Sequence, residues 1–151
     1  MNNELPDTLL SDTELATLIK GATSVAVVGV SAKPDRASNQ IAEYLIKETD
    51  LEVLLVNPLV EELWGGKVYS SLGEATEALG RPIDIVDAFR KSEDIPALAG
   101  ELSSVGAKTL WMQLGIRNDD ESARLRDAGI EVIQNRCIKI EIEKLRAHNL
   151  L

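Results

Sequence analysis

The sequence predicts an α/β domain, built as one Rossmann-like open parallel sheet of five to six strands with helices on both faces. Apolar runs alternate along the chain with segments of helical spacing, and short connections join them. The first run, Val25 to Val30, is continuously apolar, as in parallel strands that are buried on both faces. The length of 151 residues fits a single domain, 1–151, and leaves no room for a separate substrate domain.

Each element has a pattern of its own. Ser11 as a cap and Gly21 as a stop predict an N-terminal helix at about residues 11–20, ahead of the first strand. The predicted strands are 25–30, 52–56, 83–89, 109–113 and 130–133, with a further short strand at 67–69. The later helices are predicted at 38–48, 72–79, 92–105, 119–128 and 138–148. Right-handed crossovers then place the strands in one parallel sheet.

Composition and charge exclude several classes of protein. Hydrophobic residues make up 44% and charged residues 27%, which is a globular composition. The 16 basic and 25 acidic residues give a net charge of -9, which repels nucleic acid and anionic membrane surfaces. No apolar run approaches the roughly 20 residues of a spanning helix. We therefore expect neither nucleic acid nor a membrane as a partner.

The rare residue types argue against a catalytic or metal centre. Cys137 is the one cysteine, which excludes an internal disulfide, and Met1 to Glu4 lack the pattern of a signal peptide. We therefore expect a cytoplasmic protein. Cys137 has no histidine nearby in the sequence to activate it, so we expect it to pack as a small apolar group. His148 is the one histidine, which disfavours a catalytic triad or a multi-histidine metal site.

The carboxyl ends of the predicted strands carry the candidate site. Ligands of open parallel sheets bind there, near the point where the strand order reverses. Polar or cationic residues follow each of the five longer predicted strands. No candidate site residue is taken from the end of the short strand at 67–69. The candidates are Gly29, Ser31, Lys33, Arg36 and Ser38 after the first strand, Asn57 and Pro58 after the second, then Arg90, then Gln113 and Gly115, and Arg136 after the last.

The loop after the first strand has the position of a dinucleotide fingerprint but not its glycines. Gly29 closes the strand, whereas Ser31 and Pro34 replace the second and third glycines. Phosphate would then be held by the side chains of this loop and by the helix N-terminus. Asn57 also ends the second strand where NAD-binding domains carry an acid for the ribose, so both departures disfavour NAD.

Each candidate also has a purely structural interpretation. The loop 31–38 can be an ordinary strand-to-helix connection, and Asn57-Pro58 and Gln113 to Gly115 can be simple turns. An arginine that follows a strand, such as Arg90 or Arg136, often only solvates a rim or pairs weakly with a carboxylate. The convergence of these residues on one edge of the sheet favours ligand binding.

Five motifs follow one another along the chain. They are Gly29-x-Ser31-x-x-Pro34-x-Arg36-x-Ser38, Val56-Asn57-Pro58, Asp84-x-Val86-Asp87-x-Phe89-Arg90, Trp111-Met112-Gln113-x-Gly115 and Asn135-Arg136-Cys137. In this order the motifs resemble those of the small stand-alone CoA-binding proteins, which are similar to the CoA-binding domain of the succinyl-CoA synthetase α subunit. The resemblance covers about residues 25–145. It departs from the family at Glu141-Ile142, where a Glu-His pair is expected, and this removes support for a histidine near the last helix.

The resemblance implies coenzyme A as the ligand. It implies CoA phosphates near Ser31, Lys33 and Arg36, with the adenine and ribose near Asn57 and Pro58. Further contacts are implied at Arg90 and Gln113.

Three functions follow as hypotheses. The first is a module that binds CoA or acyl-CoA as a carrier, sensor or partner subunit, without chemistry of its own. The second is an enzyme, either an NAD(P)-binding oxidoreductase or a detached CoA-ligase domain that requires another chain. The third is an interaction protein with a vestigial pocket. A protein partner or a homo-oligomer stays open in all three.

Overall fold

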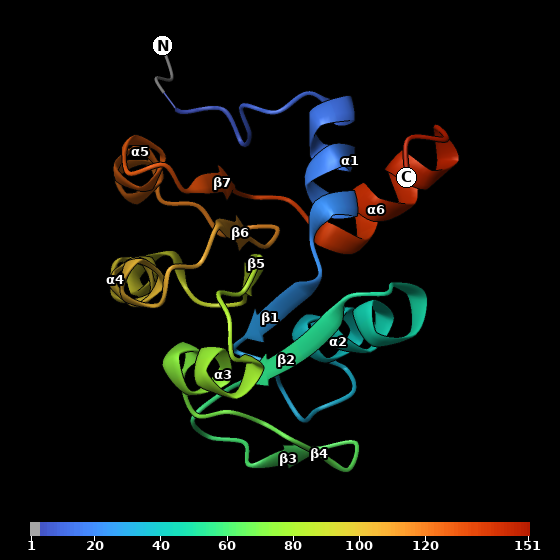
Figure 1. Cartoon of the computed structure of the whole chain (residues 1–151), viewed down its shortest axis with the longest axis vertical. Coiled ribbons are helices and arrows are strands. Elements are labelled where there is room, and N and C mark those ends of the chain that lie inside the picture. The colour runs from blue at the N-terminus through green and yellow to red at the C-terminus, as the bar shows by residue number, and fades with distance from the viewer. Residues whose placement is uncertain (1–3) are drawn as a thin grey trace.

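The computed structural model describes residues 4–151, in which strands and helices alternate along the chain (Figure 1). Residues 1–3, on which the signal-peptide prediction partly rests, lie outside the described residues. The parallel strands are β1 (Ser24–Val28), β2 (Glu52–Val56), β5 (Ile85–Ala88), β6 (Thr109–Met112) and β7 (Glu131–Ile133). The helices are α1 (Asp12–Gly21), α2 (Ala37–Glu48), α3 (Leu72–Leu79), α4 (Ile95–Val105), α5 (Asp119–Asp127) and α6 (Ile138–Ala147), with a 3-10 turn at Ser92–Asp94.

The main sheet confirms the predicted Rossmann-like class. Its five strands are all parallel, in the order β2-β1-β5-β6-β7. Val28 at the end of β1 pairs with Val56 on one side and with Ala88 on the other. The strand order therefore reverses between β1 and β5, because the chain builds outward first from one side of β1 and then from the other (Figure 1).

The predicted short strand at 67–69 does not form a sixth strand of this sheet. Instead, β3 (Glu62–Leu63) and β4 (Gly66–Lys67) pair antiparallel as a small hairpin, and Tyr69 makes only an isolated bridge to Val56. Trp64 and Gly65, with φ of 53° and 75°, form the tight turn between them. The sequence did not reveal this hairpin because strands of two residues are too short to show an alternating pattern.

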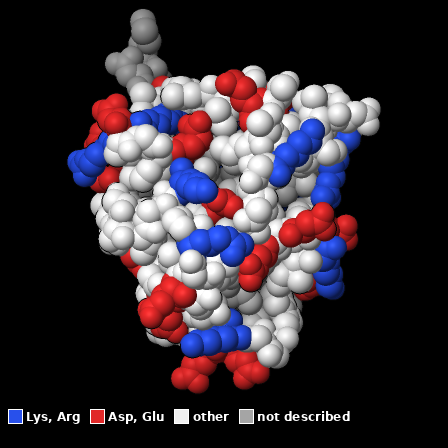
Figure 2. Space-filling model, viewed as in Figure 1, with Lys and Arg blue, Asp and Glu red and all other residues white. Residues whose placement is uncertain are grey.

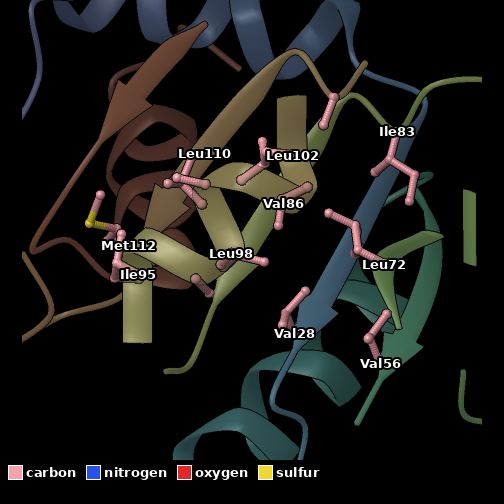
Figure 3. Packing of buried hydrophobic residues seen from close by; sticks show 14 of the residues in the cluster. Val28, Val56, Leu72, Ile83, Val86, Ile95, Leu98, Leu102, Leu110 and Met112 are labelled. Carbon is pink, nitrogen blue, oxygen red and sulfur yellow. The ribbon is translucent and has the colours of Figure 1, made fainter. Parts of the chain in front are cut away.

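Two aliphatic clusters cover the two faces of the sheet, which explains why the strands read as continuous apolar runs. One face packs against α3, α4 and α5, where Val28, Val86 and Leu110 meet Leu72, Leu98 and Leu102 (Figure 3). The other face packs against α1, α2 and α6 through residues including Leu15, Val25, Val27, Leu45, Ile85, Trp111, Ile138 and Leu145. Both faces of the central strands are thus removed from water, and the free energy of folding comes mainly from this aliphatic burial.

The N-terminal helix begins at the predicted cap. The Ser11 hydroxyl accepts a hydrogen bond from the Glu14 amide at 3.2 Å, and the Glu14 carboxylate accepts one from the Ser11 amide at 3.0 Å. This reciprocal pair satisfies two amide groups at the start of α1. Within residues 4–151, none of the helices combines the length and the apolar character that crossing a bilayer requires.

Candidate functional site

A pocket opens where the strand order reverses, beyond the carboxyl ends of β1 and β5. Its volume is about 400 Å³, and the loop that enters α2 forms most of its wall. Figure 1 shows this loop connecting the end of β1 to the start of α2. The lining residues are Gly29, Ser31, Lys33, Arg36, Ala37, Ser38 and Phe89, so the structure brings together all five candidates of the first loop.

Gly29 allows this pocket to form. Its φ of 93° lies in the left-handed region that residues with a Cβ rarely adopt. A Cβ at this position would also lie 2.5 Å from the carbonyl oxygen of Phe89, which is backbone and has little freedom to move. The ends of β1 and β5 can therefore approach each other closely only with glycine at this position.

The N-terminus of α2 faces the pocket without a capping side chain. Arg36 is the N-cap residue and its side chain makes no capping hydrogen bond, whereas α1, α3 and α5 are capped by Ser11, Ser71 and Asn118. The first turn of α2 also lacks an acidic residue. Amide groups at an uncapped helix start, together with the helix dipole, form a ready anion-binding site.

The cations around this pocket have no carboxylate partner among the described residues. Lys33, Arg36, Arg90 and Lys91 form no ion pair there, whereas eight other lysines and arginines do. Asp35 is exposed in the same loop and offsets part of their charge. Figure 2 shows acidic and basic side chains interspersed over the face that it displays. Lys33 and Arg36 line the pocket, and Arg90 and Lys91 follow its lining residue Phe89, so positive charge gathers here in a chain with a net charge of -9.

Asn57 connects the loop after β2 to the loop after β1. Its Nδ2 donates to the Val30 carbonyl at 2.7 Å, and its Oδ1 accepts from the Leu59 amide at 2.9 Å. Pro58, the next residue, is exposed. The Asn57 side chain thus joins two of the loops that carry candidate residues, and the adjacent Pro58 stays accessible to a ligand.

The candidates after β6 and β7 are engaged within the protein. Gln113 is only 5% exposed, and its Oε1 accepts a hydrogen bond from the Ile138 amide at 3.2 Å, which caps α6. The Gly115 amide donates to the side chain of Asn135 at 2.8 Å. Arg136 lies 3.5 Å from a carboxylate oxygen of Glu141 and 4.0 Å from Asp7. These contacts favour structural roles for Gln113, Gly115 and Arg136.

Arg117, which the sequence did not single out, anchors the N-terminal segment beside β7. Its guanidinium donates to Asp7 and to Asp119, both at 2.9 Å, and to the Leu5 carbonyl at 2.6 Å. The Asp119 carboxylate raises the pKa of Arg117, and the Arg117 guanidinium lowers the pKa of Asp119. The backbone amide of Arg117 donates to the Ser92 hydroxyl at 3.2 Å, which holds the loop that carries Arg90 and Lys91. Sequence patterns could not reveal this network because Leu5 lies more than 100 residues from Arg117.

Asp87 is an ionisable residue in the middle of the sheet. It pairs in register with Val27 and Trp111, is fully buried, and neither of its carboxylate oxygens has a hydrogen-bond partner among the described residues. Burial raises the pKa of Asp87 well above its ordinary value of 3.8. We therefore expect a neutral carboxylic acid at this position in the folded protein.

Cys137 and His148 occupy the two ends of α6. Cys137 is the N-cap residue, partly buried and outside any disulfide, while His148 is the exposed C-cap residue. About ten residues of helix, with a rise of about 1.5 Å per residue, separate them, so the imidazole does not stand beside the thiol. Among residues 4–151, the structure brings together no group of three or more His, Cys, Asp and Glu side chains that could hold a metal ion.

The fold and the pocket define the class of nucleotide-binding Rossmann-like domains, because the cationic loop and the glycine turn lie at the point of strand reversal. The family model described as CoA binding domain matches residues 23–143. The chain therefore belongs to the CoA-binding domain family.

Two proteins of similar length match nearly the whole chain, and part of a longer protein shares its fold. The chain is 35% identical over 130 residues to the uncharacterized protein YneT of Bacillus subtilis (strain 168), covering 86% of this chain and 93% of YneT. A hypothetical protein from Pyrococcus horikoshii OT3 superimposes with a TM-score of 0.83 at 31% identity, covering 97% of this chain and 99% of the other. The dinucleotide forming acetyl-coenzyme A synthetase 1 of Ca. Korarchaeum cryptofilum shares the fold over 75% of this chain and 26% of its own, with a TM-score of 0.63 and 22% identity.

Proposed function

We propose that this protein binds CoA or acyl-CoA as a non-catalytic carrier, sensor or partner module. The observation that carries the proposal is the pocket between Gly29 and Phe89, in which unpaired cations meet an uncapped helix N-terminus. Membership of the CoA-binding domain family supports CoA as the anionic ligand.

The phosphate groups of CoA contact Lys33, Arg36 and the first amides of α2 in this proposal. Charged donors bind phosphate more strongly than neutral ones, and the guanidinium of Arg36 can donate two parallel hydrogen bonds. The adenine and ribose lie near Asn57 and Pro58, at the end of β2. Arg90 follows β5 on the other side of the pocket and supplies a further contact.

The residues that line the pocket bind and orient an anion rather than transform it. The Ser31 hydroxyl accepts a hydrogen bond from the Lys33 amide at 3.1 Å, and no lining residue is a histidine or carboxylate that could act as its base. Lys33 and Arg36 are exposed, as expected for side chains that close over a ligand from the rim. These features support a binding module.

Calorimetric titration with CoA, NAD and NADP tests this proposal. We expect CoA to bind more tightly than either dinucleotide, because β2 ends in Asn57 and not in an acid that would bind ribose hydroxyls. Tighter binding of NAD or NADP would contradict the proposal and favour an oxidoreductase. The absence of saturable binding for all three ligands would favour an interaction protein with a vestigial pocket.

A further inference from the structure

Two buried side chains of α2 form hydrogen bonds with the backbone amide and the backbone carbonyl of Ser31. The Ser31 amide donates to the hydroxyl of Ser38 at 2.9 Å, and the Ser31 carbonyl accepts from Nδ2 of Asn39 at 2.9 Å. Ser38 is 6% exposed and Asn39 is 3% exposed. The first turn of α2 therefore fixes the backbone of the loop that precedes it.

Two further amide side chains hold carbonyl groups of the same stretch. Asn57 donates to the Val30 carbonyl at 2.7 Å, and Gln40 donates to the Pro34 carbonyl at 3.2 Å. The carbonyls of Val30, Ser31 and Pro34 are thus each bound by a side-chain amide. An oxygen lone pair that is engaged in this way is held in a fixed direction and repels a nearby anion less than a free one.

The burial of Asn39 separates its role from that of the exposed cations. A side chain that is almost wholly inside the protein cannot form the main contact with a ligand in the pocket. It can still raise the affinity, because a loop that is already ordered loses less conformational entropy on binding. Asn39 lies three residues before Ala42, so it is a polar residue on the buried stripe of α2.

We propose that Ser38 and Asn39 are positioning residues that fix the Ser31 backbone before CoA binds. This inference rests on the proposed function, and it assigns Ser38 a role other than the direct phosphate contact that the sequence suggested. The phosphate is bound by Lys33, Arg36 and the helix N-terminus, while Ser38 and Asn39 keep the loop in the shape that receives it.

The test compares Asn39→Leu and Ser38→Ala with Arg36→Ala, by CoA titration at low and moderate ionic strength. We expect Asn39→Leu and Ser38→Ala to weaken CoA binding about fivefold to tenfold, the loss that follows from one or two neutral hydrogen bonds. Their affinity should fall with added salt as steeply as that of the wild type, because the cations that contact phosphate remain. Arg36→Ala should instead lose part of its salt dependence. Ser103→Ala, an exposed serine on α4, serves as the matched control for Ser38→Ala.

Hydrogen exchange of the free protein provides a second readout that does not depend on CoA. The Ser31 amide should exchange faster in Ser38→Ala than in the wild type, because its acceptor is removed, while the amides of β1 stay protected. If the wild type binds no CoA, the proposed function fails, and exchange at Ser31 alone decides whether the loop is held as described.

Two results would overturn the inference. The first is wild-type affinity, within about twofold, in folded Asn39→Leu and Ser38→Ala together with unchanged exchange at Ser31. The second is a loss of salt dependence in Asn39→Leu equal to that in Arg36→Ala, which would assign Asn39 to phosphate contact. If Asn39→Leu does not fold, Ser38→Ala carries the same comparison.

Discussion

The cations at the carboxyl ends of the strands differ between the two halves of the sheet. Beyond β1 and β5, Lys33, Arg36 and Arg90 have no carboxylate partner within the described part of the chain. Beyond β6 and β7, Arg117 and Arg136 are bound by Asp7, Asp119 and Glu141. A charge that is already neutralised by a neighbour attracts a new anion less strongly. A position at the carboxyl ends of the strands is therefore not enough for a cation to bind an anion, and in the proposed function we expect the half with unpaired cations to bind CoA.

Arg36 gives the largest expected effect, since it tests the half with free cations. Arg36→Ala should weaken CoA binding about tenfold to hundredfold, because hydrogen bonds to charged groups contribute about 1.5 to 3 kcal/mol. Arg36→Lys should recover only part of this, because an ammonium keeps the charge but lacks the planar fork. Calorimetry at low and moderate ionic strength measures both variants.

The control for Arg36 is the stability of the variants. The Arg36 side chain makes no capping hydrogen bond and no ion pair in the described structure, so both variants should unfold at the wild-type temperature. A folded Arg36→Ala that binds CoA within about twofold of wild type would place the phosphate site elsewhere.

Asp87 tests the same contrast for carboxylates, since Asp7 and Asp119 have partners and Asp87 has none within residues 4–151. Its pKa in the folded protein is raised above the ordinary value of 3.8. Below that value the group is neutral in both states. As the pH rises, Asp87 ionises first in the unfolded chain. The free energy of unfolding therefore decreases between the ordinary pKa and the raised pKa of the folded protein.

Asp87→Asn removes this titration while keeping the size of the side chain. The free energy of unfolding of the variant, relative to the wild type, should increase as the pH rises above the ordinary pKa of an aspartate, because only the wild type must keep Asp87 neutral in the folded state. The slope of this increase cannot exceed about 1.4 kcal/mol per pH unit. Urea unfolding across this pH range measures it. Parallel stability curves for the two proteins would show that Asp87 titrates normally.

Arg136 gives the smallest expected effect. It tests the half of the sheet in which the cations already have carboxylate partners. Arg136→Ala should change CoA affinity by less than about threefold, because Asp7 and Glu141 already offset its charge. The same titration as for Arg36→Ala makes the two values directly comparable. A loss as large as that of Arg36→Ala would mean that the whole edge contacts the ligand.

The sequence predicted the class of fold because burial leaves a local trace. Each parallel strand had to be apolar on both faces, and each helix had to be apolar on one, so the order of elements was readable from short windows. The grouping of the five candidates of the first loop around one pocket was predictable for a related reason, since the chain that leaves β1 lines this pocket before it enters α2. The hairpin β3–β4 had too few residues to leave such a trace.

The tertiary structure decided the distant partners of the charged residues. Arg90 and Arg136 look alike in the sequence, because each follows an apolar strand. What separates them are two carboxylates beside Arg136, Glu141 at 3.5 Å and Asp7 at 4.0 Å, and the fold brings Asp7 there from the other end of the chain. The sequence by itself thus determined the parallel sheet and its helices through patterns of local burial, and with them the edge at which parallel sheets of this kind bind ligands. Which cations are left without a carboxylate partner depends on how the folded chain places carboxylates around them, from residues both near and distant in the sequence.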